Sequence, residues 1–300
     1  NQLNSPYAGR WVALVRGRVV AQGGTPEQAL RASQASRHKE RAEIRFMPIP
    51  FNFPPLLEKI IRLLPPDEEV YLVGGAVRDL LTNRLSPDFD FALPSSGISL
   101  ARRIANSLQA DFMVLDDERD TGRVVLTNDD GTFTYLDFAT YRGATLEDDL
   151  RDRDFTINAI AFNPRDTTII DPLNGATDIR AKVIRACSPT SLLQDPVRIL
   201  RGVRQAAAFG FGIEKNTREL MKQAAGAIEN VSIERLRDEV FKMLGGPKAS
   251  ASIRALEMLG VLTHLMPELL KMKGVTQSPP HIHDVWTHTL AVLDQLDNLM

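Results

Sequence analysis

The sequence predicts an α+β protein with a small N-terminal α+β module, a head built on a mixed β-sheet, and a helical neck and body. Strand-like runs with few helices between them fill the region from about 70 to 140, which argues against a doubly wound sheet. From residue 152 onward the pattern is almost wholly helical. The expected domains are the module at 1–50, the head at 51–175, the neck at 176–247 and the body at 248–300.

The composition is that of an ordinary globular protein. Its 300 residues hold 36 Lys and Arg against 38 Asp and Glu, and 43% are hydrophobic, which excludes disordered and collagen-like chains. A single cysteine, Cys187, excludes a disulfide scaffold and indicates a reducing cytoplasm. No apolar run approaches the roughly 20 residues of a membrane span, so we expect no membrane partner. The chain opens with Asn1 and closes at Met300 inside an apolar helical pattern, and we expect both ends to be trimmed.

Charge is distributed unevenly along the chain. Residues 71–180 hold 11 Lys and Arg against 19 Asp and Glu, whereas residues 181–248 hold 12 against 7. Residues 1–50 hold eight against three. Acidic clusters suit divalent metal ions and basic surfaces suit phosphates. Three solvated surfaces would give the same balance, so charge alone does not decide between these interpretations.

Hydrophobic periodicity and turn residues define the expected elements. In the N-terminal module we expect a hairpin over 10–22, a helix from Thr25-Pro26 to about Lys39, and a strand over 42–48. In the head the pattern predicts helices at 56–63, 76–82 and 100–109 and strands at 69–73, 89–93, 112–115, 123–127 and 132–140. Beyond the last of these strands it predicts helices at 152–161, 176–186, 194–208, 215–228, 232–244, 249–259 and from about 285.

The first candidate site is a strand that runs through Gly74 and Gly75 into a helix with Arg78 in its first turn. Glycines allow a ligand to approach the backbone closely, and N–H groups at a helix N-terminus bind phosphate. Arg78 can add a bidentate contact to the same anion. A tight strand-to-helix turn without a ligand is the alternative interpretation.

Two carboxylates, Asp88 and Asp90, enter the next strand about ten residues later. Alternation places both on one face, where their like charges are unfavourable unless a cation lies between them. Mg²⁺ prefers oxygen ligands of this kind. Asp137, on the strand expected at 132–140, is a candidate third carboxylate, and three such groups can hold two metal ions. A surface loop is the alternative for an isolated Asp-x-Asp pair.

A third segment carries Arg153, Asp154 and Asn158. Asp154 and Asn158 are four residues apart, so they would share one face of a helix. A carboxylate accepts from hydroxyl groups, an amide both donates and accepts, and Arg153 can meet a triphosphate. A solvated helix start would contain the same residues.

The fourth segment opens a helix at Asp195-Pro196, with Asp195 as the expected N-cap and an arginine at every third position thereafter. The arginines are Arg198, Arg201 and Arg204. They lie along one side of the helix and repel each other unless anions or acids meet them. Asp195 and Arg198 together offer acceptor and donor groups to the edge of a base. An ordinary salt-bridged helix start is the alternative for this pair.

In this order the four segments resemble the class II tRNA nucleotidyltransferases and bacterial poly(A) polymerases, the family of CCA-adding enzymes. The resemblance runs from about Val70 to Pro247. It rests on Gly-Gly-Ala-Val-Arg-Asp, the Asp88/Asp90 pair, Arg-Asp-Phe-Thr-Ile-Asn-Ala and Asp-Pro-Val-Arg, and the segment 232–239 also matches a helical signature of the family. The resemblance therefore implies a nucleotidyltransferase head.

The resemblance also implies a role for each matched residue. Asp88 and Asp90 would hold catalytic Mg²⁺, with Asp137 as a third catalytic carboxylate. The residues implied to bind the nucleotide are Gly75, Arg78, Arg153, Asp154, Asn158, Asp195, Arg198, Arg201 and Arg204. Among these, Asp195 and Arg198 would read the incoming base without a nucleic-acid template. An RNA 3′-hydroxyl would attack the α-phosphate of CTP or ATP and release pyrophosphate.

The implied function is metal-dependent addition of C, A or both to the 3′ end of tRNA in the cytoplasm, with tRNA, CTP and ATP as partners. A poly(A) polymerase, or an enzyme that adds only CC or only A, is the alternative within the family. A non-catalytic RNA-binding protein is the alternative of another class. The Asp88/Asp90 pair argues against it, because a pure binder would gain by losing these charges. The sequence leaves the oligomeric state open.

Two features depart from the family pattern. Gln194 stands where the family usually has Glu, and its amide keeps the acceptor oxygen but loses the charge, so we expect a weaker N-cap or hinge role. Residues 1–50 fall outside the family core. Their helix and its flank carry Arg31, Arg37, Lys39 and Arg41. We interpret these as a solvated face, with contact to RNA as the alternative.

Three histidines near the end of the chain suggest a second site. His281, His283 and His288 resemble the opening of an HD domain, in which His288 would be the first histidine. The paired His-Asp motif of such a domain would lie beyond Met300. We therefore interpret the three histidines as loop and surface residues of an incomplete HD region rather than as metal ligands.

Overall fold

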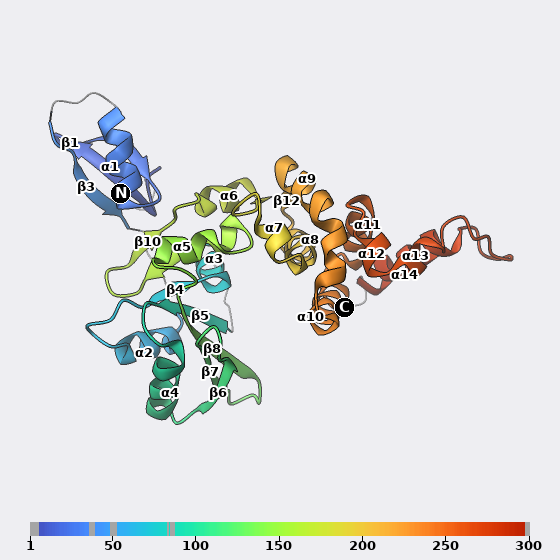
Figure 1. Cartoon of the computed structure of the whole chain (residues 1–300), viewed down its shortest axis with the longest axis horizontal. Helices are drawn as coiled ribbons and strands as arrows, with labels where there is room; N and C mark the ends of the chain where they lie inside the picture. Colours follow the sequence, from blue (N-terminus) through green and yellow to red (C-terminus); the bar gives the residue numbers. More distant parts are fainter. Residues whose placement is uncertain (1–5, 36–39, 49–52, 83, 85–87, 298–300) are drawn as a thin grey trace. The chain divides into compact units, whose positions relative to one another are not determined.

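The chain forms two compact units, residues 1–179 and residues 180–300 (Figure 1). The computed structural model describes residues 6–35, 40–48, 53–82, 84 and 88–297. The division lies close to the predicted boundary at 175, while the boundaries at 50 and 247 stay predictions. Within the described ranges, none of the helices is both long enough and apolar enough to cross a bilayer.

The N-terminal module is a three-stranded antiparallel sheet with one helix. Its elements are β1 (Arg10–Val15), β2 (Arg18–Gly23), α1 (Pro26–Ala35) and β3 (Glu43–Met47), in the strand order β2-β1-β3. The predicted hairpin turns at Arg16 and Gly17, which both adopt the positive φ that a tight two-residue turn requires. Thr25 Oγ1 accepts from Gln28 N at 3.2 Å and starts α1 as predicted. The predicted end near Lys39 lies outside the described residues.

The head is built on a seven-stranded sheet with the order β10-β9-β4-β5-β8-β7-β6. Its strands are β4 (Tyr71–Val73), β5 (Asp88–Leu93), β6 (Asp111–Asp116), β7 (Thr121–Thr127), β8 (Phe133–Thr140), β9 (Ala161–Asn163) and β10 (Thr168–Ile170). Its helices are α2 (Pro55–Leu63), α3 (Gly75–Leu81), α4 (Gly97–Leu108), α5 (Leu146–Arg151) and α6 (Gly175–Ala181). β5 and β8 are parallel and the other neighbours antiparallel, which confirms the predicted mixed sheet.

The core of the head lies between the sheet and α4. Phe91 on β5 and Phe138 on β8 are each at most 1% exposed, and their rings stack with centroids 4.7 Å apart. α4 packs on β7 and β8 (Figure 1). Its Leu100 and Ile104 are buried. Because side chains alternate along a strand, the residues next to these aromatic rings, Asp90 among them, project from the opposite face of the sheet.

Hydrogen bonds join the N-terminal module to β10 and the turn that follows it. They run from Trp11 Nε1 to Ile169 O (2.8 Å), from Gln28 Nε2 to Pro172 O (2.8 Å) and from Arg10 Nη2 to Asn174 Oδ1 (2.9 Å). Arg10 also lies 3.7 Å from the fully buried carboxylate of Asp171. The module is therefore an extension of the head, although the family core does not include it.

The prediction of a helix over 152–161 is wrong. The chain forms a single 3-10 turn, η2 (Thr156–Asn158), and then enters β9 and β10, which complete one edge of the sheet. Strands of three residues are too short to show the alternation on which a sequence-based assignment depends. The helix predicted at 176–186 is also too long, because α6 ends at Ala181.

The second unit is helical, as predicted, with one short parallel strand pair, β11 (Val183–Ile184) and β12 (Gly212–Ile213), in its described part. Its longer helices are α8 (Val197–Phe209), α9 (Lys215–Ala224), α10 (Ile233–Leu244), α11 (Ala249–Met258) and α14 (Val285–Asp297). Its shorter ones are α7 (Ser191–Gln194), η3 (Ala225–Asn230), α12 (Leu262–Leu265) and α13 (Pro267–Leu270). α8 packs against α10 and α11.

Candidate active site

The candidate catalytic carboxylates lie on the face of the head sheet opposite α4. In the strand register Asp90 on β5 pairs with Asp137 on β8, which pairs in turn with Arg123 on β7. Asp88 pairs with Tyr135 two residues earlier along the same strands. Residues at matched register positions project to the same side of a sheet. Three strands thus bring together the three carboxylates and one arginine.

Arg123 binds both oxygens of Asp137. Its Nε donates to Asp137 Oδ1 and its Nη2 donates to Oδ2, each at 2.7 Å. The guanidinium also lies over the ring of Tyr135, 4.8 Å from the centroid. The hydrogen bonds to Asp137 raise the pKa of Arg123 further. The role of Asp137 as a third catalytic carboxylate stays a prediction.

Asp88 lies in an environment that disfavours its negative charge. Burial raises the pKa of the Asp88 carboxyl above its usual value, and the nearby charge of Asp137 acts in the same direction. A hydrogen bond from the backbone of Tyr135 and the charge of Arg123 oppose this rise. A carboxylate of this kind fits a cation, and the oxygens of Asp88 and Asp90 are the donors that Mg²⁺ prefers. Within the described residues no group of three or more His, Cys, Asp or Glu is arranged to hold a metal.

Gly74 lies where Asp90 and Arg153 approach the backbone. Its φ is +71°, a conformation that L residues rarely adopt. A Cβ at this position would lie 3.0 Å from Asp90 Oδ2 and 3.2 Å from Arg153 Nη1. Glycine therefore allows an acidic and a basic group to lie together beside the turn into α3, and the close approach of a ligand to this turn stays a prediction.

A chain of hydrogen bonds links three of the predicted nucleotide-binding residues. Arg78 Nη1 donates to Asn158 Oδ1 at 2.7 Å, and Asn158 Nδ2 donates to Asp154 Oδ1 at 2.9 Å. The Asp154 and Asn158 side chains belong to residues that are 7% and 6% exposed. Their contact was expected from a shared helix face, and the 3-10 turn η2 makes it instead. Gly75 lies next to this chain, since a Cβ there would lie 3.3 Å from Arg78 Nη2.

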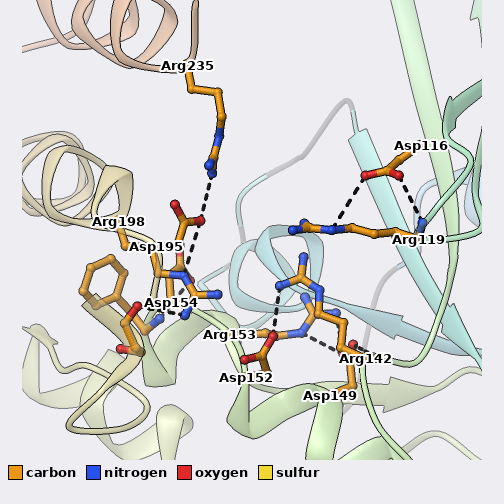
Figure 2. Close-up of polar contacts among 12 residues, drawn as sticks. Asp116, Arg119, Arg142, Asp149, Asp152, Arg153, Asp154, Asp195, Arg198 and Arg235 are labelled. Carbon is orange, nitrogen blue, oxygen red and sulfur yellow. Dashed lines mark hydrogen bonds and ion pairs between the residues drawn. The ribbon is translucent and has the colours of Figure 1, made fainter. Parts of the chain in front are cut away.

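Asp149 positions two further arginines of the head. It is 2% exposed and accepts from Arg153 Nε and Nη2 through Oδ2, at 3.1 and 2.8 Å. Its Oδ1 accepts from the backbone N of Arg142 at 3.1 Å. The Arg142 guanidinium lies 3.6 Å from Asp152 (Figure 2). Burial lowers the pKa of Arg142 and the charge of Arg153 lowers it further, while the charges of Asp149 and Asp152 oppose this fall.

The predicted base-reading residues lie in the second unit. Asp195 is not the N-cap of α8, contrary to the prediction, because the helix begins at Val197 and Pro196 is its N-cap. The Asp195 carboxylate binds Arg235 instead: Arg235 Nη2 donates to Oδ2 at 2.8 Å (Figure 2). Arg198 Nε lies 3.8 Å from the same oxygen, and Arg198 is 6% exposed. Asp195 Oδ1 is buried and has no hydrogen-bond partner among the described residues.

A pocket of about 280 Å³ opens beside Asp195 within the second unit. Its polar lining includes Gln194, Asp195, Asn230, Ser232 and Arg235. Gln194, the residue that departs from the family pattern, thus lines the pocket from the C-terminal end of α7.

The other two arginines of α8 are bound by a buried acid. Arg204 Nε donates to Glu239 Oε2 at 2.7 Å, and Arg201 Nη1 lies 3.6 Å from Oε1. Glu239, on α10, is 5% exposed, and Lys242 lies 3.8 Å from it. Glu239 is therefore the acid that the arginine row requires. The assignment of Arg201 and Arg204 to nucleotide binding stays a prediction.

The three histidines near the C-terminus lie around the start of α14. The rings of His281 and His288 meet edge to face with centroids 5.0 Å apart. Asp284 Oδ1 accepts from Thr287 N at 2.8 Å, and Oδ2 accepts from Gly274 N at 2.7 Å. Hydrogen bonds from Thr287 and Gly274 lower the pKa of Asp284 to about 2. Asp284 thus caps a helix, and the interpretation of the histidines as loop and surface residues stands as a prediction.

Four residues of these sites do not stand out in the sequence: Arg123, Arg142, Arg235 and Glu239. Arg123 is placed beside Asp137 by the register of β7 on β8, and spacing along the chain does not predict that register. Arg142 follows the end of β8 and has no motif around it. Arg235 and Glu239 are four residues apart in the helical signature at 232–239, so a shared helix face was an available signal.

Two family models match this chain. The model described as the Poly A polymerase head domain matches residues 70–185, and the model described as the probable RNA and SrmB-binding site of polymerase A matches residues 210–272. The first match contains the carboxylates of β5 and the Arg78–Asn158–Asp154 chain. Together the two matches define a protein of the nucleotidyltransferase class.

Similar proteins are tRNA-processing enzymes. The CC-adding tRNA nucleotidyltransferase of Synechocystis sp. is 40% identical over 206 residues, 68% of this chain and 48% of that protein. The A-adding tRNA nucleotidyltransferase of Deinococcus radiodurans is 37% identical over 230 residues, 75% of this chain and 51% of that protein. The chain spans about half the length of these curated relatives.

Solved structures agree with these similarities. The Thermotoga maritima CCA-adding enzyme, solved in complex with tRNA, has a TM-score of 0.64 and 34% identity over 76% of this chain and 55% of that chain. A CCA-adding enzyme solved with ATP has a TM-score of 0.66 and 32% identity over 82% of this chain and 58% of that chain. This chain belongs to the tRNA nucleotidyltransferase and poly(A) polymerase family, as its motifs predicted.

Proposed function

We propose that this chain transfers CMP, AMP or both from CTP and ATP to the 3′ end of tRNA, with Mg²⁺ and without a nucleic-acid template. One observation carries the proposal: Asp88 and Asp90 share a face of the sheet beside the Gly74 turn, which Arg153 also approaches. The CC-adding and A-adding relatives support the same reaction class.

Phosphoryl transfer depends on positioning and electrostatics more than on covalent chemistry from the protein. The tRNA 3′-hydroxyl loses its proton to solvent water, its oxygen forms a bond to the α-phosphorus, the bond from that phosphorus to the bridging oxygen breaks, and pyrophosphate leaves. Asp88 and Asp90 would hold Mg²⁺, which when bound stabilises negative charge on the phosphate oxygens. Asp137 lies one strand away on the same face.

The arginines of the head would bind the nucleotide's triphosphate. Arg78 and the backbone at Gly75 would contact phosphates, while Arg153, Asp154 and Asn158 would contact the triphosphate and ribose. The hydrogen bonds of Arg78 to Asn158 and of Arg153 to Asp149 support this assignment, because they fix the direction of each side chain before a ligand binds.

Asp195 and Arg198 would select the base. Cytosine and adenine each carry an exocyclic amino group that donates a hydrogen bond, whereas guanine offers a carbonyl oxygen at the corresponding position. The buried Oδ1 of Asp195 has no donor among the described residues and would accept from such an amino group. Arg201 and Arg204 would support the pair by keeping α8 fixed on α10 through Glu239.

The helical second unit would bind the tRNA backbone. Residues 181–248 hold 12 Lys and Arg against 7 Asp and Glu, and binding by charge and shape needs no base sequence. A cytoplasmic location fits a tRNA-processing reaction and stays part of this proposal.

A product-length assay tests the proposal. The full chain is incubated with tRNAs that lack the whole CCA end, the last two nucleotides or only the terminal A, with each nucleotide supplied separately. CTP added to the first tRNA and ATP added to the third would indicate complete CCA addition. No extension of any tRNA by any nucleotide would contradict the proposed activity.

The same assay separates the alternatives. Extension by CTP with no addition of ATP to the third tRNA would indicate a CC-only enzyme, and extension of the third tRNA alone by ATP would indicate an A-only enzyme; relatives with both names are compatible with these forms. Long runs of A would indicate a poly(A) polymerase. Binding of tRNA with no extension would indicate the non-catalytic RNA-binding alternative, against which the Asp88/Asp90 pair argues.

A further inference from the structure

Asp137 is already bound on the face that would hold the metal. Both of its oxygens accept from Arg123, at 2.7 Å each, in the bidentate geometry that gives arginine–carboxylate pairs their strength. The Arg123 side chain is 28% exposed and the Asp137 side chain 18%, so solvent screens the pair only partly. A metal ion that binds an oxygen of Asp137 would therefore share that oxygen with a hydrogen bond from Arg123.

Arg123 is itself fixed from a second direction. Its guanidinium lies 4.8 Å from the centroid of the Tyr135 ring, and Tyr135 is the register partner of Asp88. Ring and carboxylate together hold the positive charge on the β8 side of the face. A divalent cation next to Asp137 would therefore meet a fixed like charge at short range, whereas Asp88 and Asp90 lie on β5, one strand further from Arg123.

Resting on the function proposed above, we propose that Asp137 is the counter-ion of Arg123 and not a metal ligand, and that Arg123 is a positioning residue that confines the divalent cation to Asp88 and Asp90. Arg123 also balances one of the three carboxylate charges that the sheet register brings together. The site then presents two carboxylates to the metal and a neutral pair beside them.

Mn²⁺ binding to the full chain, measured by isothermal titration calorimetry without nucleotide or tRNA, tests this assignment. The variants are Arg123→Met, Asp137→Asn with Arg123→Met, and Asp88→Asn with Asp90→Asn. In Arg123→Met the released Asp137 becomes a third ligand, and the Kd for Mn²⁺ falls roughly tenfold or more. In the Arg123→Met/Asp137→Asn variant the whole ion pair is absent and Asp88 and Asp90 are unchanged, so the Kd stays within about twofold of wild type.

The Arg123→Met/Asp137→Asn variant decides whether Asp137 is a metal ligand, because it changes no net charge and leaves neither partner of the ion pair behind. It can therefore be measured even where Arg123→Met alone fails to fold. A Kd for Mn²⁺ at least about tenfold weaker in this variant would show that Asp137 is a ligand in the wild type and would overturn the proposal. The matched control is Arg62→Met/Glu58→Gln, which removes an exposed ion pair on α2 and leaves the Kd unchanged.

The third variant separates this inference from the proposed function. Loss of Mn²⁺ binding in Asp88→Asn/Asp90→Asn identifies the site on β5. Wild-type binding in that variant would reject the metal assignment on which the proposed function depends, whatever Asp137 does.

Discussion

The charged groups of the head sheet and of helix α8 are organised in opposite ways. On the sheet, Asp88, Asp90 and Asp137 come together with one arginine, and burial raises the pKa of Asp88 above its usual value. On α8, the arginines meet buried or half-buried acids: Glu239 binds Arg201 and Arg204. The sheet face groups three carboxylates with Arg123, and the helix groups its three arginines around two acids, Asp195 and Glu239. The chemistry is therefore expected on the sheet, and base selection at the start of the helix.

Replacing either carboxylate of β5 should have the largest effect. We expect Asp88→Asn and Asp90→Asn to lower kcat for nucleotide incorporation by roughly a thousandfold or more, the scale of losing a preorganised electrostatic group. The affinity for tRNA should stay within about twofold, because phosphate contacts elsewhere dominate it. Incorporation assays and tRNA filter binding on the same preparations check this. Normal turnover in either variant would remove the metal assignment.

Glu239→Gln should destabilise the fold, because it leaves Arg201 and Arg204 without their acid. We expect a loss of about 2 kcal/mol, less than the ~3–5 kcal/mol of a fully buried pair because the two arginine side chains are 39% and 25% exposed. Urea unfolding of the full chain measures it. Asp238→Asn is the matched control, since Asp238 pairs with Arg237 at the surface and should cost little. Equal losses of unfolding free energy in both variants would contradict the role of Glu239 as the acid that holds Arg201 and Arg204.

Arg198→Ala should change the choice among nucleotides more than the binding of RNA. A side-chain contact to a base edge contributes about 1–3 kcal/mol of discrimination, so the preference for CTP and ATP over UTP and GTP should fall roughly tenfold or more. Comparison of kcat/KM for the four nucleotides checks this, with the exposed Arg218→Ala on α9 as control. An unchanged preference would exclude Arg198 from base selection.

The N-terminal module allows a test of whether positive charge outside the head sheet and α8 contributes to tRNA binding. Arg18, Arg31 and Arg41 are exposed, whereas Arg45 pairs with Glu43 at 2.6 Å. If the module holds RNA, changing the first three to Gln raises the Kd for tRNA and flattens its salt dependence by about 0.7–0.9 for each phosphate that is no longer neutralised. Arg45→Gln should have a smaller effect. No change in Kd or slope would support the solvated face.

The smallest effect concerns Asp284 at the start of α14. Its pKa is lowered to about 2 by hydrogen bonds from Thr287 and Gly274, from an ordinary value of 3.8. A carboxyl with a lowered pKa stabilises the fold above the ordinary value, and this contribution disappears as the pH falls towards 2. Asp284→Asn should therefore lower Tm slightly at pH 7, and the difference from wild type should shrink below pH 4. A constant difference across this range would contradict the assignment.

Local signals predicted much of this molecule. The hairpin at Arg16-Gly17, the start of α1 and most helices of the second unit follow from turn residues and periodicity within a few positions. The family motifs likewise bring Asp88, Asp90, Gly74 and Arg78 into the head as expected. These are features that a short stretch of chain specifies by itself.

The failures come from contacts between distant segments. β9 pairs with β4 and with β10. β9 and β10 have only three residues each, which is too short to show the alternation of apolar and polar side chains. Arg123 reaches Asp137 through the register of β7 on β8, and Arg235 binds Asp195, which was expected to be an N-cap. Each of these contacts depends on residues that are distant in the sequence, so no local sequence pattern predicts it.

The most direct test of the proposed chemistry follows the phosphorus of CTP. tRNA that lacks its CCA end is mixed with the full chain, Mg²⁺ and CTP labelled either at the α- or at the γ-phosphate. We expect the α-label to appear in RNA and the γ-label in pyrophosphate in equal amounts, with neither in the Asp88→Asn/Asp90→Asn variant. Release of the γ-label as inorganic phosphate without labelled RNA, or transfer by the variant at the wild-type rate, would contradict the account.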